Sequence, residues 1–394
     1  MLYQILITIG ASQALALGIL LLLKRQRQPG DQLLSFVLML MFLIIMLFNY
    51  RYELLLTRLP LCLHSFTLAY LVLPAFYQYI KIATHGKCQD RWQDVLPHYL
   101  PFIGVVSLMA IFYLPMPFPQ QRELYDSVHS GSGPLWFLLI YYGLFLIMFP
   151  VYIWLTLREL QKHEHYVLTC FSYTEEISLG WLNRFIWAVG VVWLGFVLFE
   201  VVGGPLYRPP LDELGINLAF ILFVVCISYL GLYGLRHQTI FLDPLPEHLR
   251  ISPGPELPKD QIQNIELAPT DAVMLAQLRE IMNQQQPHRR PRLTLNELAE
   301  LCGWSPHQLS RLINEAAGQH FFDFVNGYRV KTFQQLVADP ENTSYTLLAL
   351  AYEAGFNSKS TFNAFFKKTT GLTPSAYVRQ LTKKPGISTA PSSS

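Results

Sequence analysis

Seven long apolar stretches constrain this chain more than any other feature of its sequence. A helix needs about 20 mostly apolar residues to cross a hydrocarbon layer of about 30 Å, because each residue adds about 1.5 Å of rise. The stretches that reach this length lie approximately at residues 2–23, 33–54, 59–82, 95–114, 134–157, 182–203 and 214–235. Seven such stretches leave too little polar surface for a soluble globular domain. The sequence therefore predicts an all-α, seven-helix transmembrane bundle over residues 1–238.

The basic residues of the short loops predict how this bundle is oriented. One set of alternate loops holds nine of them: Lys24, Arg25, Arg27, Lys81, Lys87, Arg91, Arg158, Lys162 and Arg184. The opposite loops hold four: Arg51, Arg58, Arg122 and Arg208. Basic loops stay in the cytoplasm, so the N-terminus is expected outside and the chain beyond Arg236 inside. The first stretch lacks the basic start and cleavage site of a signal peptide, and we interpret it as a retained helix.

A change in composition separates this region from the rest of the chain. Lys and Arg against Asp and Glu number 14 and 13 in residues 1–240, and 15 and 14 in the shorter remainder. Six prolines among polar residues predict a solvated Pro-rich cytoplasmic linker over 239–269. A connecting helix is expected over 270–288, then a domain over 289–384 and a disordered tail over 385–394. The net charge of +2 is small, so binding to nucleic acid would depend on local charge.

Two segments of the C-terminal domain share one pattern of helix, glycine turn and helix. In residues 294–318, Thr294 and Glu297 form a capping box, Gly303 permits a left-handed turn, and Ser305 opens a second helix. Residues 346–371 repeat the scheme around Gly355, with the second helix starting one residue later. One such pattern is a weak signal, but two with matching spacing predict a double helix-turn-helix domain.

The segment between the two patterns predicts a single helix over residues 320–338. Its 19 residues would measure about 28 Å, so it could hold two recognition helices about one DNA turn, roughly 34 Å, apart. Both helices could then enter successive major grooves on one face of the duplex.

These residues carry a resemblance to a known family. Residues 292–382 resemble the DNA-binding domain of the AraC/XylS family of bacterial transcription regulators. The similarity is clearest in LTLNELAELCGWSPHQLSRLINEAAG, FFDFVNGYRV and AYEAGFNSKSTFNAFFKKTTGLTPSAY. Most members carry a soluble sugar-binding or dimerisation domain at the N-terminus, whereas this chain has apolar spans there. It is similar in this respect to the membrane-bound branch of the family, and a sugar ligand is not implied.

The resemblance implies that the second helix of each unit faces the major groove. In the first unit the expected exposed positions are His307, Gln308, Ser310 and Arg311. The guanidinium of Arg311 can donate two hydrogen bonds to guanine O6 and N7. The alternative for each of these residues is an ordinary solvated helix face.

In the second unit the expected DNA-binding residues are Lys359, Ser360, Thr361 and Asn363. Asn363 can pair with adenine N6 and N7. Lys367 and Lys368 suit phosphate groups, which orient a protein on DNA without choosing sequence. Ala364 stands where similar sequences often have arginine, so base reading by this unit is expected to be weaker or differently placed. Aromatic residues at helical spacing are interpreted as core: Trp304, Phe324, Phe356, Phe362, Phe365 and Phe366.

The membrane half offers one candidate for signal sensing. Glu200 lies within the sixth apolar stretch, where an ionised carboxylate is costly, although its place near the outer end could let it reach water. His163, His165 and Cys170 lack a fourth partner for a metal, and the five scattered cysteines show neither disulfide nor zinc spacing. No catalytic, cofactor or metal motif is recognised, so an enzyme is not expected.

The sequence thus predicts a transcription regulator of the bacterial inner membrane that binds double-stranded DNA. The membrane lipid, an unknown signal ligand and a second copy of the chain in a homodimer are its candidate partners. The preferred mechanism is one-component signalling from the bundle through the linker to the DNA-binding domain. Two alternatives are a transporter or channel with a DNA-binding appendage, and a C-terminal helical bundle that binds protein.

Overall fold

The computed structural model describes residues 2–25, 30–50, 64–85, 91–129, 134, 143–175, 177–198, 211–236 and 269–383. Within these ranges the chain is all-helical, as predicted, and pairs backbone as β structure only in an isolated antiparallel bridge between Phe171 and Thr294. The candidate Glu200, residues 239–268 of the predicted linker and the predicted tail 385–394 lie outside the described residues.

The helices divide into two compact units. The first comprises Met1–Gln161 and Leu179–Pro244, and the second comprises Lys162–Ser178 and Leu245–Ser394. The composition of the sequence suggested one division in the linker. The segment between the fifth and sixth predicted spans, however, groups with the C-terminal domain.

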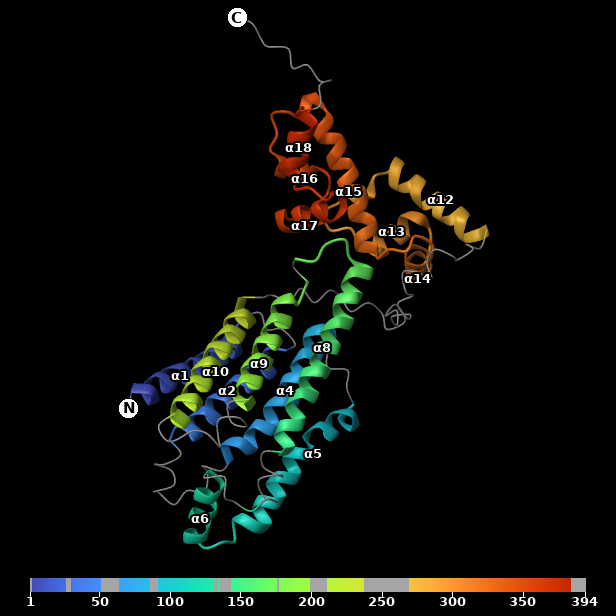
Figure 1. Ribbon diagram of the computed structural model, residues 1–394. Helices are drawn as coiled ribbons and strands as arrows, with labels where there is room; N and C mark the ends of the chain where they lie inside the picture. The colour runs from blue at the N-terminus through green and yellow to red at the C-terminus, as the bar shows by residue number, and fades with distance from the viewer. Residues whose placement is uncertain are drawn as a thin grey trace, which may run out of the picture. The chain divides into compact units, whose positions relative to one another are not determined.

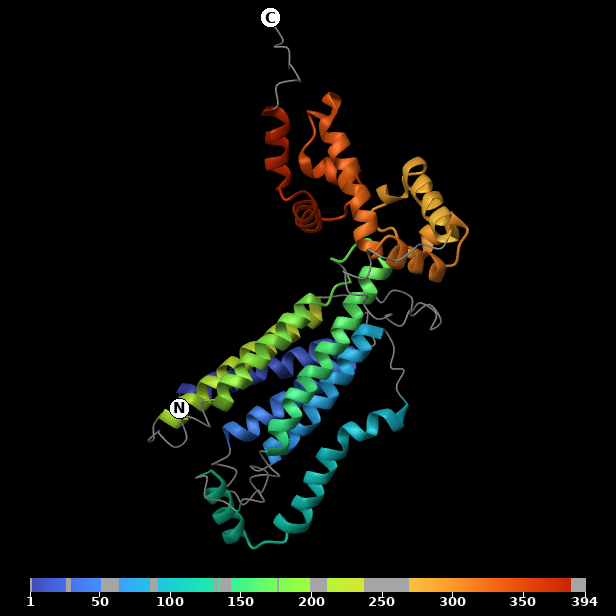
Figure 2. The same cartoon turned by 45° about the vertical axis from the view of Figure 1, so that its right-hand side comes forward.

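Each predicted apolar stretch coincides with a helix over part or all of its length, and these helices belong to the first unit apart from residues 162–170 of α8. These helices are α1 (Leu2–Leu23), α2 (Asp31–Asn49), α4 (His64–His85), α5 (Trp92–Leu108, continued by a π-helical turn Met109–Tyr113), α8 (Leu144–Cys170), α9 (Gly180–Leu198) and α10 (Leu211–Arg236). A further short helix, α6 (Phe118–His129), occupies a segment that we expected to be a loop. Figures 1 and 2 show α1, α2, α9 and α10 side by side.

Small residues bring the helices of this bundle close together. A Cβ placed on Gly10 of α1 would collide with Val224 of α10, and one placed on Gly231 of α10 would collide with Leu17 of α1. Polar contacts join other pairs: the Ser35 hydroxyl donates to the carbonyl of Gly18 over 2.7 Å. Close glycine packing and buried hydroxyl bonds are the devices by which helices associate where apolar burial gives little advantage.

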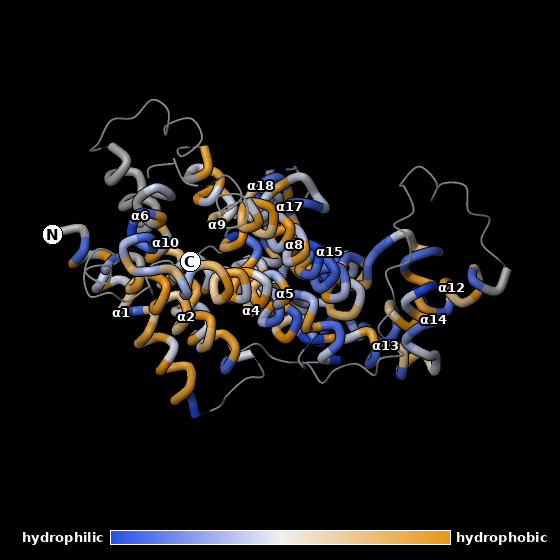
Figure 3. Tube along the Cα trace, turned by 90° about the horizontal axis from the view of Figure 1, so that it is seen from below, coloured by the Kyte–Doolittle hydropathy of each residue, from blue (hydrophilic) through white to orange (hydrophobic). Residues whose placement is uncertain are grey.

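Length and composition allow two described helices to cross a membrane: Trp92–Tyr113 and Leu144–Cys170. Shorter apolar helices occur at Ile7–Leu23, Asp31–Leu47 and Val224–Leu235. In Figure 3 the orange of hydrophobic residues predominates in helices of the first unit such as α2. Two such helices are weak evidence for a membrane protein, because the buried core helix of a soluble protein can pass the same test. The predicted count of seven spans is therefore not established by the fold.

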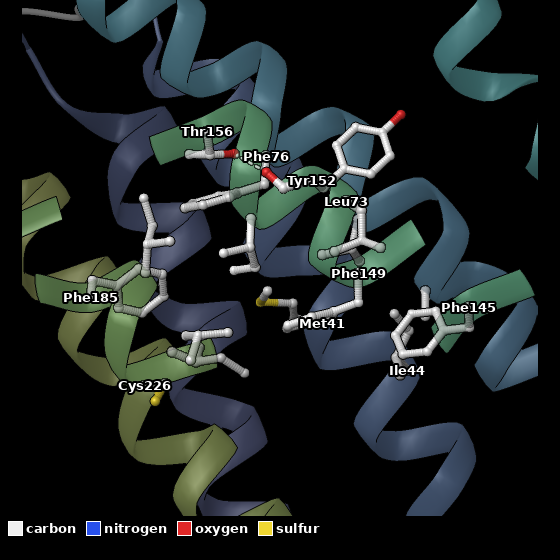
Figure 4. A pocket seen from close by; sticks show the side chains of 16 residues that line it. Met41, Ile44, Leu73, Phe76, Phe145, Phe149, Tyr152, Thr156, Phe185 and Cys226 are labelled. Carbon is white, nitrogen blue, oxygen red and sulfur yellow. Dashed lines mark hydrogen bonds between the residues drawn. The ribbon is translucent and has the colours of Figure 1, made fainter. Parts of the chain in front are cut away.

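An apolar cavity lies among α2, α4, α8, α9 and α10 of the first unit (Figure 4). Its volume is about 130 Å³, and its lining includes Met41, Phe76, Phe149, Phe185 and Cys226. The Thr156 hydroxyl that reaches it donates to the carbonyl of Tyr152 over 2.7 Å. The cavity therefore suits a small apolar molecule, since an apolar space of about 150 Å³ is large enough for benzene.

The second unit contains the helices of residues 269–383. They are α12 (Pro269–Gln284), α13 (Leu295–Cys302), α14 (Pro306–Arg311, continued by a π-helical turn Leu312–Ala316), α15 (Phe321–Ala338), α16 (Leu347–Glu353), α17 (Lys359–Thr370) and α18 (Pro374–Lys383). Two cores form on either half of α15. Leu298, Leu309 and Phe321 belong to the first core, and Phe333 and Phe366 belong to the second.

Candidate nucleic-acid interface

Local capping fixes the first helix-turn-helix unit as the sequence predicted. The Thr294 hydroxyl accepts from the Glu297 amide, while the Glu297 carboxylate accepts from the Thr294 amide over 2.7 Å. Gly303 ends α13 with φ 70°, a conformation that costs other residues about 1–2 kcal/mol. Ser305 and Gln308 then form a second capping box at the start of α14. Each cap satisfies amides that would otherwise lack partners at the helix start.

The second helix-turn-helix unit repeats this arrangement with simpler caps. Thr346 caps α16, and the Ser358 hydroxyl accepts from the Thr361 amide at the start of α17 over 3.1 Å. Gly355, in the turn, has φ 100°, and Gly371 closes α17 with φ 75°. The helix α17 starts four residues after its turn glycine, whereas α14 starts three residues after Gly303. The predicted extra residue in the second turn is therefore confirmed.

The aromatic residues predicted as core are buried or partly buried. Phe356, Phe362, Phe365 and Phe366 pack in the second core, while Phe324 is buried and Trp304 partly buried in the first. Stacking on bases is accordingly not their role in this fold.

In the first unit the exposed face of α14 differs from the prediction at one position. His307, Gln308 and Arg311 are exposed, but Ser310 is buried at 2% exposure and accepts from the Asn314 side chain over 3.2 Å. Our expectation that Ser310 is exposed was wrong, because its side chain is buried against Asn314. The Gln308 oxygen is used by the capping box, accepting from the Ser305 amide over 3.0 Å.

Arg311 is held by two acidic side chains. Its guanidinium donates to the Asp271 carboxylate of α12 over 2.8 Å and to Glu315 over 3.3 Å. The hydrogen bond that Arg311 donates to Asp271 is the main cause that raises the pKa of Arg311 above its ordinary value. A guanine contact by Arg311 would therefore replace an existing ion pair.

The helix that carries Asp271 belongs to the first core. Leu275, Leu278 and Met282 of α12 are buried among the residues of α13 and α14. From the sequence we predicted that residues 270–288 form a connecting helix outside the DNA-binding domain. Its packing instead makes α12 part of the first helix-turn-helix unit.

In the second helix-turn-helix unit the predicted DNA-binding residues lie along α17. Lys359, Ser360, Asn363 and Lys367 are exposed, and Thr361 is half-buried. Lys368 is also exposed, but its ammonium donates to the Asp323 carboxylate of α15 over 2.7 Å. The two neighbouring lysines thus differ in their surroundings: Lys367 is exposed, whereas the ammonium of Lys368 forms an ion pair with Asp323.

A buried arginine that the sequence analysis missed lies at the centre of the domain. Arg329 of α15 is fully buried and donates six hydrogen bonds, all to uncharged oxygens. The acceptors lie on Ser172, Asn326 and the backbone of residues 288–291. Burial lowers the pKa of Arg329 to about 9, so the group stays charged at neutral pH. The signal that could have revealed it is a charged residue among the apolar positions of α15.

His288 is the second buried ionisable group of this region. Its Nε2 lies 2.8 Å from the Thr332 hydroxyl, and its ring packs against Tyr328. Burial, with the nearby charges of Arg329 and Arg289, lowers the pKa of His288 to about 4. The imidazole is therefore neutral in the folded domain near pH 7.

Comparison with known proteins agrees with this geometry in the C-terminal region. Residues 298–380 match the family model described as "Helix-turn-helix domain". Residues 298–380 are a helix-turn-helix domain. Uncharacterised helix-turn-helix-type transcriptional regulators of Staphylococcus aureus strains COL and MSSA476 are each 34% identical over 90 residues. That region is 23% of this chain and 12% of each relative, so the chain spans only a small part of their length. No solved structure matched significantly.

These matches support the DNA-binding prediction for the C-terminal region. They cover α14 and α17, the two helices on which the candidate residues lie. They do not cover the compact unit formed by Met1–Gln161 and Leu179–Pro244.

Proposed function

We propose that the chain is a membrane-anchored, sequence-specific transcription regulator of the AraC/XylS type. The observation that carries this proposal is the presence of two capped helices, α14 and α17, on the two halves of one helix, α15. The 18 residues of α15 span about 27 Å, which suits recognition helices that enter grooves about 34 Å apart. The exposed polar faces of α14 and α17 supply the side chains for contact.

Roles within this interface follow from side-chain chemistry and exposure. Arg311 is proposed to read guanine once it leaves Asp271, and Asn363 to read adenine. Lys359 and Lys367 are proposed to bind phosphate, because their ammonium groups are exposed beside the start and end of α17. His307, Gln308, Ser360, Thr361 and Lys368 are proposed to line the same surface.

Membrane anchoring is supported by the apolar surface of the first unit. Large apolar side chains are exposed on its helices at Ile9, Leu23, Leu100, Ile111, Ile147, Trp154, Trp187, Val191, Leu198, Val225 and Leu232. A lipid bilayer would cover exposed apolar side chains of this kind. Together with the basic loops, this supports insertion in a bacterial inner membrane with the C-terminal domain in the cytoplasm.

Signal sensing is the third part of the proposal. The apolar cavity in the bundle contacts five helices, and it suits a small apolar signal rather than a sugar or an ion. A ligand acts as a signal only if it binds one arrangement of the helices more tightly than another. Paired copies of the chain on two DNA sites would suit a homodimer.

DNA binding is tested with the full chain in detergent. A duplex selected from a random library by the protein should bind at least about 1,000-fold more tightly than a scrambled duplex, measured by fluorescence anisotropy at several salt concentrations. Equal affinity for both duplexes at every salt concentration would contradict the regulator.

Topology is tested with reporters that are active only outside the cytoplasm. A fusion after Arg236 should be silent, and a fusion after Arg122, in a predicted outer loop, should be active. The reverse pattern, or recovery of the chain in the soluble fraction, would refute membrane anchoring.

A further inference from the structure

The segment that follows α8 packs against the start of the first helix-turn-helix unit. We refer to residues 171–175 as the strap. Phe171 forms the antiparallel bridge with Thr294, and the Ser172 amide donates to the carbonyl of Leu293 over 3.2 Å. Phe171 and Ser172 are both buried. The strap therefore pairs with the backbone at the N-cap of α13, although more than 100 residues of chain separate the two.

The strap also contacts the helix between the two units. The carbonyl of Ser172 accepts from the Arg329 guanidinium over 2.8 Å and from the Asn326 amide over 3.2 Å, and the Ser172 hydroxyl accepts from Arg329 over 2.9 Å. Arg329 has no exposed surface. If the strap left, a buried cation would lose hydrogen-bond partners, which costs more than losing an exposed bond.

The other donors of the same arginine bind the segment before α13. They reach the carbonyls of His288, Arg290 and Pro291 over 2.9, 2.8 and 3.2 Å. One guanidinium thus ties the strap, α15 and the entry to the first unit into a single network. A shift of the strap would therefore disturb the hydrogen bonds that Arg329 makes to the strap, to α15 and to the segment before α13.

At its other end the strap contacts the second helix-turn-helix unit. The Ser358 hydroxyl donates to the Glu175 carboxylate while it accepts from the Thr361 amide at the start of α17. Glu175 thereby orients the hydroxyl that caps the second recognition helix. The negative charge is also favourable near the N-terminus of a helix.

We infer that the strap is a positioning element that holds both helix-turn-helix units in their DNA-binding arrangement. The strap contacts the first helix-turn-helix unit, α15 and the second helix-turn-helix unit within five residues. The inference rests on the proposed function only where it concerns DNA, because the contacts themselves lie within one folded unit.

The first test measures whether the strap stabilises both units. The full-length double variant Phe171→Ala, Ser172→Gly should speed hydrogen exchange at the Leu298 and Phe362 amides, which form the first backbone bonds of α13 and α17, at least about tenfold. The matched control is Ser344→Gly, Tyr345→Ala, which makes equivalent truncations at exposed positions of the same unit. Ser172→Gly alone should give a smaller change in the same direction. Unchanged exchange at either amide would overturn the inference.

The second test measures the consequence for DNA. With duplexes selected by the wild-type chain, the strap variant should lose at least about tenfold affinity for a duplex with both half-sites and less than about threefold for one half-site. Equal losses on both duplexes, or a gain of affinity, would contradict positioning. If the wild-type chain selects no sequence, the proposed function fails, while the exchange experiment still decides the role of the strap.

Discussion

The two helix-turn-helix units share a pattern but are stabilised and charged differently. The first core is mainly aliphatic, with Leu298, Leu309 and Leu312 among its residues, whereas the second is built around Phe333, Phe362 and Phe366. The first helix-turn-helix unit keeps Arg311 in an ion pair with Asp271 of α12, while the second exposes lysines along α17. Similar caps and turns therefore do not imply equal readiness for DNA. We expect the second unit to engage phosphate first and the first unit to require an exchange of partners.

The largest expected difference between the units lies at their turn glycines. A Cβ on Gly355 would overlap the carbonyl of His288 and lie 2.8 Å from the Arg289 Cα, but one on Gly303 would meet nothing within 4 Å. Gly355→Ala should lower the free energy of unfolding by at least about 3 kcal/mol, and Gly303→Ala by about 1–2 kcal/mol for its positive φ alone. Hydrogen exchange of the α15 amides would measure both. Equal losses would show that the second turn is as open as the first.

The junction between the units should respond to acid through His288. Its folded pKa of about 4 lies below the unfolded value of about 6.5. The stability from neutral His288 is complete above pH 6.5 and is lost as pH falls towards 4, because only the unfolded chain then binds the proton. The loss should be on the order of 3 kcal/mol.

Exchange of the α15 amides, corrected for its intrinsic pH dependence, measures this loss. His288→Gln should flatten the profile between pH 6.5 and 4. A variant with the wild-type profile would assign the acid sensitivity to another group.

In the first unit, the ion pair of Arg311 is expected to limit DNA binding. Arg311→Ala should cost about 1–3 kcal/mol at one base position, and Asp271→Asn should increase affinity for the selected duplex several-fold by releasing the guanidinium. Glu300→Gln, an exposed acid of α13, controls for the change in net charge. Lower affinity in Asp271→Asn than in Glu300→Gln would show that the ion pair orders the reading side chain.

The smallest expected effects concern the two neighbouring lysines of the second unit. Lys367→Ala should weaken all duplexes alike and reduce the salt dependence of binding by about one phosphate contact. Lys368→Ala should have less effect, because Lys368 must first leave Asp323. Lys331→Ala, on the exposed side of α15, removes the same charge as a control. A larger effect for Lys368 than for Lys367 would reverse these roles.

The sequence by itself determined the features that depend on neighbouring residues. Thr294 with Glu297, Gly303 and Ser305 marked the first helix, turn and second helix, since caps and positive φ angles are set within one helical turn. The apolar stretches likewise predicted where long helices lie, because the length and composition of a stretch depend only on neighbouring residues. Exposure was harder to predict, and Ser310 proved buried because its environment depends on how α14 packs.

Only the tertiary structure decided which distant segments meet. Ser172 and Arg329 are 157 residues apart, and neither carries a local pattern that announces the other. Asp271 likewise met Arg311 only because α12 packs into the first core. Such contacts depend on the path of the whole chain, and a buried charge gains partners from whichever backbone that path brings near.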